Sequence, residues 1–320
     1  MIKISDTLRA LEPHPLDFVE VAVLERDGLV ESRHRGLAAL VGPDGKLIDH
    51  LGPAKRVIYP RSSVKPLQVV AMRRAGLNLV GEELAICAGS HQGTKRHTDL
   101  VGQILAGIDL DESALQCPPG WPGNPAARAE AHSETRLAFN CSGKHAGFIA
   151  ASAAAGWDTA TYLEPEHQIQ VLVREVLEEF SGEKILHSTV DGCGAPLHTI
   201  TVEGLARAFG KVAATEPEIV DAMLANPWAV GDVKSPDAII MEHGMVAKLG
   251  AEGIFAIGLK SGHGVAVKIA DGSLRAAPLV ALRLLERNGL ISAELYSQLC
   301  EKLTVKSMGG SQVLGELRAL

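Results

Sequence analysis

The chain has 320 residues and a mass of 33.8 kDa, and 46% of its residues are hydrophobic while 22% are charged. These proportions are close to a globular average and exclude a disordered or fibrous protein. The formal net charge of −7, without a long run of lysine or arginine, argues against a broad nucleic-acid-binding surface.

The sequence has no apolar stretch near the roughly 18 to 20 residues that cross a bilayer, and residues 1–11 lack the apolar region of a signal peptide. We therefore expect a cytoplasmic protein whose partners are small molecules, with neither nucleic acid nor membrane among them. Five cysteines without framework spacing predict free thiols in that compartment. The length suits one compact unit over residues 1–320.

Apolar periodicity changes twice along the chain. Alternation predicts opening strands, and a 3.6-residue period then predicts helices. Short apolar segments between glycines predict later antiparallel strands, followed by a closing helix packed on them. The expected strands are 20–24, 37–41, 57–59, 244–249, 253–259 and 264–269, and the expected helices are 62–76, 82–86, 94–106, 144–156, 166–180, 199–209 and 274–288. Prolines and glycines make 118–125 a loop.

Strands at both ends of the chain with helices between them predict an α+β fold, because no regular strand–helix alternation is present. We expect an antiparallel sheet from about 18–60 and 240–290, flanked by helices, and a helix-rich lobe at about 62–210. The sequence shows no internal repeat and no evident linker.

The strongest local signal lies where the strand at 57–59 gives way to a helix. Ser62 and Lys65 are three positions apart, so their side chains share one helix face. A serine here could simply cap the helix. If the face is buried, however, a neutral Lys65 could take the proton of the Ser62 hydroxyl, as in the Ser-x-x-Lys arrangement of serine β-lactamases.

Further clusters carry polar groups on small-residue turns. Residues 87–93 place Ser90 after an apolar segment, where a ligand could meet backbone and hydroxyl groups, although an ordinary turn explains the same pattern. Lys248 precedes Leu249 and Gly250, a partial match to the Lys-Thr-Gly of β-lactamases. Cys141 and Cys193, with a third group, could bind zinc, or they could be buried inert thiols, and their spacing does not decide.

Taken together, these stretches resemble the asparaginase II family, typified by the rhizobial inducible L-asparaginases, which are similar in fold to serine β-lactamases and glutaminases. The resemblance runs from about residue 33 to 285, and the run Asn-Cys-Ser-Gly-Lys-His-Ala-Gly at 140–147 is highly specific. The other matching stretches are 60–65, 87–93, 164–167, 191–193 and 248–253.

The resemblance implies two serine–lysine pairs, Ser62 with Lys65 and Ser90 with Lys248, and Lys260 is a rival for the second lysine. It also implies a zinc ion that modulates substrate binding and a homodimer. The residues it assigns to zinc are Cys141, Lys144 and Cys193. The residues it assigns to substrate are Arg61 for the carboxylate, Asp191 for the ammonium and His145 in the pocket wall.

The leading hypothesis is hydrolysis of L-asparagine to L-aspartate and ammonia through an acyl-enzyme. One alternative is a β-lactamase-like or other serine amidohydrolase. Another is a non-catalytic protein that binds zinc or a metabolite on the same fold.

Overall fold

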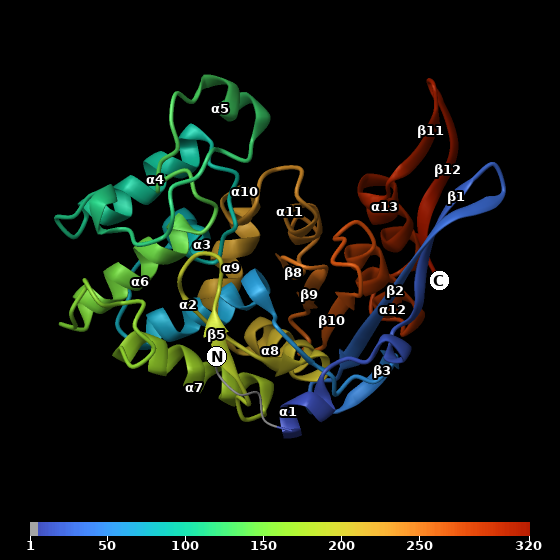
Figure 1. Ribbon diagram of the computed structural model, residues 1–320, viewed down its shortest axis with the longest axis horizontal. Coiled ribbons are helices and arrows are strands. Elements are labelled where there is room, and N and C mark those ends of the chain that lie inside the picture. The colour runs from blue at the N-terminus through green and yellow to red at the C-terminus, as the bar shows by residue number, and fades with distance from the viewer. Residues whose placement is uncertain (1–5) are drawn as a thin grey trace.

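A computed structural model describes residues 6–320. Residues 1–5, part of the segment expected to lack a signal peptide, lie outside the described residues. The chain forms an antiparallel sheet on one side and a helix-rich lobe on the other, as the right and left halves of Figure 1 show. The predicted α+β class is confirmed in this sense of mixed helices and antiparallel sheet.

The main sheet has eight strands, in the order β11-β12-β1-β2-β10-β9-β8, with β3 paired to β2 beside this path. The strands are β1 (Val19–Arg26), β2 (Leu29–Val41), β3 (Leu47–Leu51), β8 (Val246–Gly250), β9 (Ile254–Gly258), β10 (Gly264–Ile269), β11 (Lys306–Gly309) and β12 (Gln312–Ala319). Two small ladders, β4 (Val57–Ile58) with β7 (Ile200–Thr201) and β5 (Ser188–Val190) with β6 (Pro196–His198), lie outside it.

The helices of the lobe and of the sheet's flanks follow the sequence between these strands. They are α1 (Asp6–Leu11), α2 (Lys65–Arg74), α3 (Gly81–Cys87), α4 (Lys95–Ala106), α5 (Pro125–Glu130), α6 (Ser142–Ala154), α7 (Gln168–Ser181), α8 (Val202–Thr215), α9 (Pro217–Ala225), α10 (Pro227–Val230), α11 (Pro236–Met241), α12 (Ala277–Arg287) and α13 (Ala293–Leu303). Short 3₁₀ turns are η1 (Pro15–Asp17), η2 (Arg61–Val64) and η3 (Glu112–Ala114).

Helix α7 shows how the sequence fixes these elements. The His167 ring accepts a hydrogen bond from the Ile169 amide at the first turn, and Gly182 ends the helix in a left-handed conformation at φ 70°. The stripe predicted for 166–180 is buried, including Val173 and Leu177. Each such stripe contributes to one continuous core that joins the lobe to the sheet.

The central strands β9 and β10 are almost entirely buried. Helix α8 packs against one side of this part of the sheet and α12 against the other, so these strands are apolar on both faces. The α8 contact is very close, because a Cβ added to Gly264 would lie 1.9 Å from the Ala206 carbonyl oxygen. Helix α12, which corresponds to the closing helix predicted at 274–288, packs on the sheet as predicted.

The structure departs from the prediction in three places. The expected helix 199–209 begins only at Val202, because Thr201 still pairs with Val57 in the β4–β7 ladder. The sheet also extends beyond 240–290, since the hairpin β11–β12 adds to it through pairing of β12 with β1. The strand predicted at 37–41 begins much earlier, at Leu29. The remaining predicted helices and strands fall within a few residues of their observed bounds, and 118–124 forms a loop apart from one bridge at Gly120.

Two properties of the described chain bear on its environment. All five cysteines are free thiols, and four of them are buried. Across residues 6–320, none of the helices combines the length and the apolar character that crossing a membrane requires.

Candidate active site

Arg61 to Lys65 sit at the junction between the two halves of the molecule. Strand β4 leads into the 3₁₀ turn η2, which packs on β8 of the main sheet, and Lys65 opens α2 directly afterwards. Ser63 is buried and donates its hydroxyl to the Pro60 carbonyl at 2.7 Å, whereas Ser62 is only half-buried. The turn thus holds Ser63 inside and leaves Ser62 partly accessible.

The amine of Lys65 is buried and bonded to the loop that follows α3. Its Nζ donates to the Gly89 carbonyl and lies 3.0 Å from Ser90 Oγ. Among the residues described, no hydrogen bond joins Lys65 Nζ to Ser62 Oγ. The structure therefore brings Lys65 to Ser90, where the sequence prediction paired it with Ser62.

Burial lowers the pKa of Lys65 to about 8. The positive charges of Lys248 and Lys144 act in the same direction, while the sulfurs of Cys141 and Cys193 oppose them. A neutral amine at this position is consequently accessible near neutral pH, as a general base requires.

Lys248 lies on β8 and is completely buried. Its Nζ is 3.2 Å from Asp237 Oδ2, on the equally buried first turn of α11, and it also donates to the Leu249 carbonyl at 3.1 Å. The contact expected between Lys248 and Ser90 is not among the hydrogen bonds of residues 6–320. The rival Lys260 is exposed and pairs with Asp221 on the surface, so Lys248 is the lysine that faces the interior.

Cys141 caps the N-terminus of α6, which places Lys144 and His145 on its first turn, both buried. Lys144 Nζ donates to Cys193 Sγ at 3.0 Å, which joins α6 to the 191–194 turn. A hydrogen bond from the Cys193 thiol holds the pKa of Cys141 well below its usual range, and the same bond raises the pKa of Cys193. Burial opposes the charge on Lys144, but the sulfurs raise its pKa overall.

Zinc would need both sulfurs and the amine deprotonated, and the raised pKa of Lys144 opposes the loss of its proton. Across residues 6–320 no three His, Cys, Asp or Glu side chains gather as a metal site, so an ion here would need the Lys144 amine as its third ligand beside the two sulfurs. His145 lies beside this set. Its Nδ1 is 2.7 Å from the Tyr162 hydroxyl, and burial lowers its pKa to about 4 although a hydrogen bond with Cys193 opposes that shift.

Arg61 and Asp191 lie against each other at the edge of this cluster. Arg61 Nε donates to Asp191 Oδ1 at 2.8 Å, and both side chains are largely buried. A ligand with both a carboxylate and an ammonium group would find one partner for each here. Arg61 also has a φ of 53°, which is unusual for a residue with a Cβ.

The structure adds residues that the sequence analysis did not single out. Asp237 is the partner of Lys248, and Tyr162 orients His145. His91 links two of the predicted stretches, since its ring is 2.9 Å from Ser142 Oγ and its amide donates to the Asn140 carbonyl. A buried lysine needs a counter-charge, but nothing in the local sequence identifies which acidic residue supplies it.

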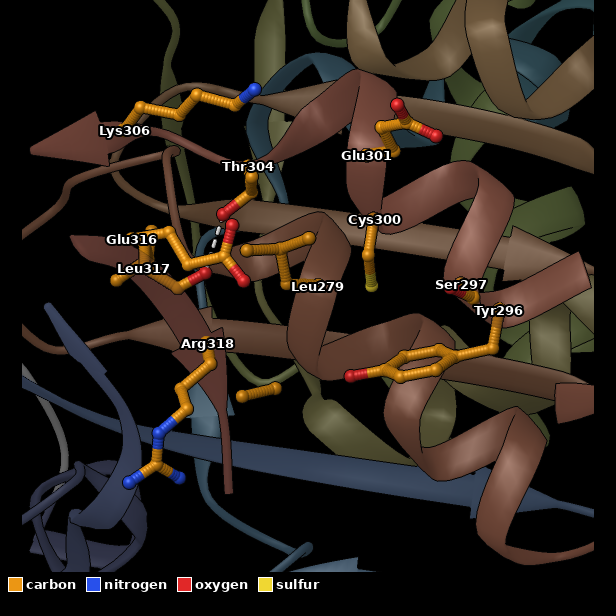
Figure 2. Close-up of a pocket in the computed structure, with 11 residues that line it drawn as sticks. Leu279, Tyr296, Ser297, Cys300, Glu301, Thr304, Lys306, Glu316, Leu317 and Arg318 are labelled. Atoms are coloured by element: carbon orange, nitrogen blue, oxygen red, sulfur yellow. Dashed lines mark hydrogen bonds between the residues drawn. The ribbon is translucent and has the colours of Figure 1, made fainter. Parts of the chain in front are cut away.

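A cavity of about 450 Å³ lies away from these residues, among α12, α13 and β12. Figure 2 shows the Cys300 thiol directed into it, the Tyr296 ring along one side, and the hydrogen bond from Thr304 to the Leu317 carbonyl across from them. None of the site residues predicted from the sequence lines this cavity.

The model of one protein family, described as L-asparaginase II, matches residues 22–319. No curated protein matches the chain. Among solved structures, Mglu in its glutamate form is 17% identical with a TM-score of 0.44, covering 80% of this chain and 61% of its own. Mglu in its native form is also 17% identical, with a TM-score of 0.45 and coverages of 81% and 66%. The chain thus spans less than two thirds of the length of these structures.

Proposed function

This chain belongs to the L-asparaginase II family, and on that premise we propose that it hydrolyses L-asparagine to L-aspartate and ammonia. The observation that carries the proposal is the buried Lys65 amine, 3.0 Å from Ser90 Oγ and one turn along the chain from the half-buried Ser62. A desolvated amine beside hydroxyl groups is the arrangement that activates a serine. The proposal includes a serine β-lactamase/glutaminase-like fold.

In the proposed reaction Ser62 Oγ attacks the side-chain amide carbon and its proton passes to neutral Lys65. In this proposal the Ser90 hydroxyl, which is bonded to Lys65, carries that proton. The tetrahedral intermediate expels ammonia, which takes up the proton, and leaves an aspartyl ester on Ser62. Water then hydrolyses the ester, with Lys65 again as the base.

Lys248 contributes a second buried positive charge near Lys65, and that charge favours the neutral form of the Lys65 amine. Asp237 holds Lys248 in place from α11. In this proposal Lys248 acts by lowering the pKa of Lys65 through its charge, and it does not contact Ser90.

Substrate recognition rests on the Arg61–Asp191 pair. The α-carboxylate would bind the Arg61 guanidinium and the α-ammonium the Asp191 carboxylate, so the substrate replaces their mutual contact with two charge-assisted ones. His145 lines the same region from α6. Glutamine differs by one methylene group, which is worth only about 1 to 3 kcal/mol, so a minor glutaminase activity is expected.

We further propose that Cys141, Lys144 and Cys193 bind zinc. The ion, when bound, would supply a fixed positive charge that strengthens substrate binding. The chain's own part would be to hold two sulfurs and an amine together. The contact of Lys144 with Cys193 and the hydrogen bond between Cys193 and Cys141 support this proposal.

The decisive experiment measures ammonia release from asparagine, glutamine and a penicillin, with hydrolysis of the penicillin followed separately. Wild type, Ser62→Ala and Ser90→Ala are compared, and Ser133→Ala on an exposed loop is the control. We expect asparagine to be the best substrate, with loss of at least about 100-fold in kcat for Ser62→Ala. Trapping the ester on Ser90 instead would overturn the assignment of the nucleophile.

Hydrolysis of penicillin alone would favour a β-lactamase-like enzyme, and turnover of none of the three, with or without zinc, would favour a non-catalytic binding protein. We also propose a cytoplasmic homodimer. Light scattering of the purified chain tests the dimer, and cell fractionation tests the location.

A further inference from the structure

A cavity of about 400 Å³ borders Arg61 and is otherwise formed by residues with no part in the proposed reaction. Pro13, Val57, Ile58 and Tyr59 give it apolar walls. A volume of this size lies in the range of pockets that hold small ligands. The apolar walls alone would accept many molecules, so the charged groups in the lining decide which class fits. They are two cations, Arg61 and Lys268, and two exposed carboxylates, Glu12 and Glu252.

Lys268, on β10, is a half-buried cation in this lining. Its Nζ donates to the backbone carbonyl of Glu252, but within residues 6–320 no carboxylate lies within salt-bridge distance of it. Burial lowers the pKa of Lys268, the negative charges of Glu252 and Asp271 oppose this shift, and the positive charge of Arg61 adds to it. The ammonium group thus has N–H donors to spare, and the carboxylates of Glu252 and Asp271 act on it only from beyond salt-bridge distance.

Arg61 contributes the second cation. Its hydrogen bond to Asp191 uses Nε, which leaves the rest of the guanidinium fork for another acceptor. Two cations that face one cavity repel each other unless an anion lies between them. A carboxylate can bind both cations, because it can accept two parallel hydrogen bonds from the Arg61 guanidinium and one from the Lys268 ammonium.

Glu252 supplies the opposite charge at the same cavity. It lies in the turn between β8 and β9, and its side chain is exposed. In the described chain its carboxylate forms no ion pair with Lys268, which bonds only to the Glu252 carbonyl. A cation on the ligand would therefore find a free carboxylate here.

The backbone around the cavity is unusual as well. Four non-glycine residues of the described chain have positive φ, and two of them, Asp27 and Asp109, are of a type that tolerates this conformation. The other two, Arg61 at 53° and Glu252 at 63°, both line this cavity. Backbone strain of this kind collects at sites where side-chain placement matters more than local stability.

We propose that this cavity is a second binding site, for a free α-amino acid whose carboxylate lies between Arg61 and Lys268 and whose ammonium group pairs with Glu252. The apolar walls leave room for a short side chain. Since Arg61 also contacts Asp191, an amino acid in this cavity would draw the guanidinium from that contact and change the KM of the proposed reaction.

The test is calorimetric titration of L-aspartate, which is not turned over, into wild type, Lys268→Met and the exposed control Lys260→Met. We expect the wild type and the control to bind aspartate at two sites, and Lys268→Met to lose one of them, with at least a tenfold rise in Kd. Its kcat on asparagine should stay within about twofold of wild type. An unchanged isotherm for Lys268→Met would overturn the proposal.

Succinate, which lacks the ammonium group, separates an amino acid site from a general carboxylate site. Glu252→Gln should weaken aspartate binding at this site at least tenfold and leave succinate binding unchanged, and equal weakening of both would rule out the amino acid assignment. Lys268→Gln replaces Lys268→Met if the latter does not melt cooperatively. A chain that releases no ammonia yet keeps Lys268-dependent binding would refute the proposed reaction alone.

Discussion

Lys65 Nζ lies 3.0 Å from Ser90 Oγ, with both groups buried where α2 faces the loop after α3. The same amine bonds the Gly89 carbonyl, so two adjacent residues of that loop fix its position. Ser62, which precedes Lys65 by one turn, is less buried than either group. The amine can therefore stay fixed on the loop while the half-buried Ser62 receives a substrate.

Lys65→Met should abolish most activity without destabilising the fold. Methionine keeps the length of the side chain and removes a group whose pKa burial has already lowered to about 8. Loss of a general base typically costs between about 100- and 10,000-fold in kcat, and we expect a loss in that range. Ammonia release gives the rate and thermal unfolding gives the stability. Lys260→Met, on the surface, should change neither.

Asp237→Asn should be strongly destabilising. The Lys248–Asp237 pair has no exposed side-chain area, so removing the carboxylate charge leaves a buried ammonium uncompensated. We expect a loss of about 3 to 5 kcal/mol in the free energy of unfolding, measured in urea. The double variant Asp237→Asn with Lys248→Met should recover much of this loss. A double variant no more stable than the single one would show that the buried charge is not the cause.

Replacing Cys141 by serine, or adding a strong chelator, tests the zinc proposal. Because the ion would act on substrate binding, we expect the KM for asparagine to rise more than kcat falls. Metal content by mass spectrometry of the native protein supplies a readout independent of activity. Cys300→Ser, on α13 away from this cluster, is the matched control. Loss of turnover with an unchanged KM would contradict the proposal.

Glu179 should make stability depend on pH in the acid range. Hydrogen bonds from Arg74 and Lys211 lower the pKa of its carboxyl to about 2, from a usual value of 4.5. The unfolded chain therefore binds a proton first as the pH falls, so this contribution is complete above pH 4.5 and is lost toward pH 2. Since Glu179 is 46% exposed, solvent limits the effect to less than about 1 kcal/mol. Urea unfolding from pH 6 to 3 should show a shallower pH dependence for Glu179→Gln.

Much of the fold follows from local patterns in the sequence. The sequence predicts α7 from an apolar stripe of helical period, and it predicts β8 to β10 from short apolar segments bounded by glycines. The hairpin β11–β12 was missed because most of its residues are exposed or half-buried, so no apolar alternation marks it. The late start of α8 reflects pairing of Thr201 with a strand about 140 residues earlier, a tertiary contact that local propensity does not contain.

In the candidate site, too, local sequence patterns predict some residues, and the packing of distant elements determines their contacts. The sequence identified Lys65, Lys144 and Cys193, and the structure buries all three and joins the last two. Their detailed partners depend on how α2, α3 and α11 pack, so the Lys65–Ser90 and Lys248–Asp237 contacts could not be predicted from spacing. The roles assigned by family resemblance to Ser62 and Ser90 remain predictions that the serine variants test.

Two glycine-to-alanine changes should have opposite effects on stability, because Gly264 lies in the close contact between α8 and β10 and Gly102 lies in open space on α4. A Cβ on Gly264 would lie 1.9 Å from the Ala206 carbonyl oxygen and 2.6 Å from the Gly210 nitrogen, so the helix would have to move away from the sheet. Gly264→Ala should therefore cost about 1 to 3 kcal/mol or more in the free energy of unfolding. Gly102, inside α4, has no atom within 4 Å of an added Cβ, and Gly102→Ala should stabilise the protein by about 0.5 to 1 kcal/mol. Urea unfolding of both variants decides the matter, and a Gly264→Ala protein as stable as wild type would mean that the helix does not approach the strand so closely.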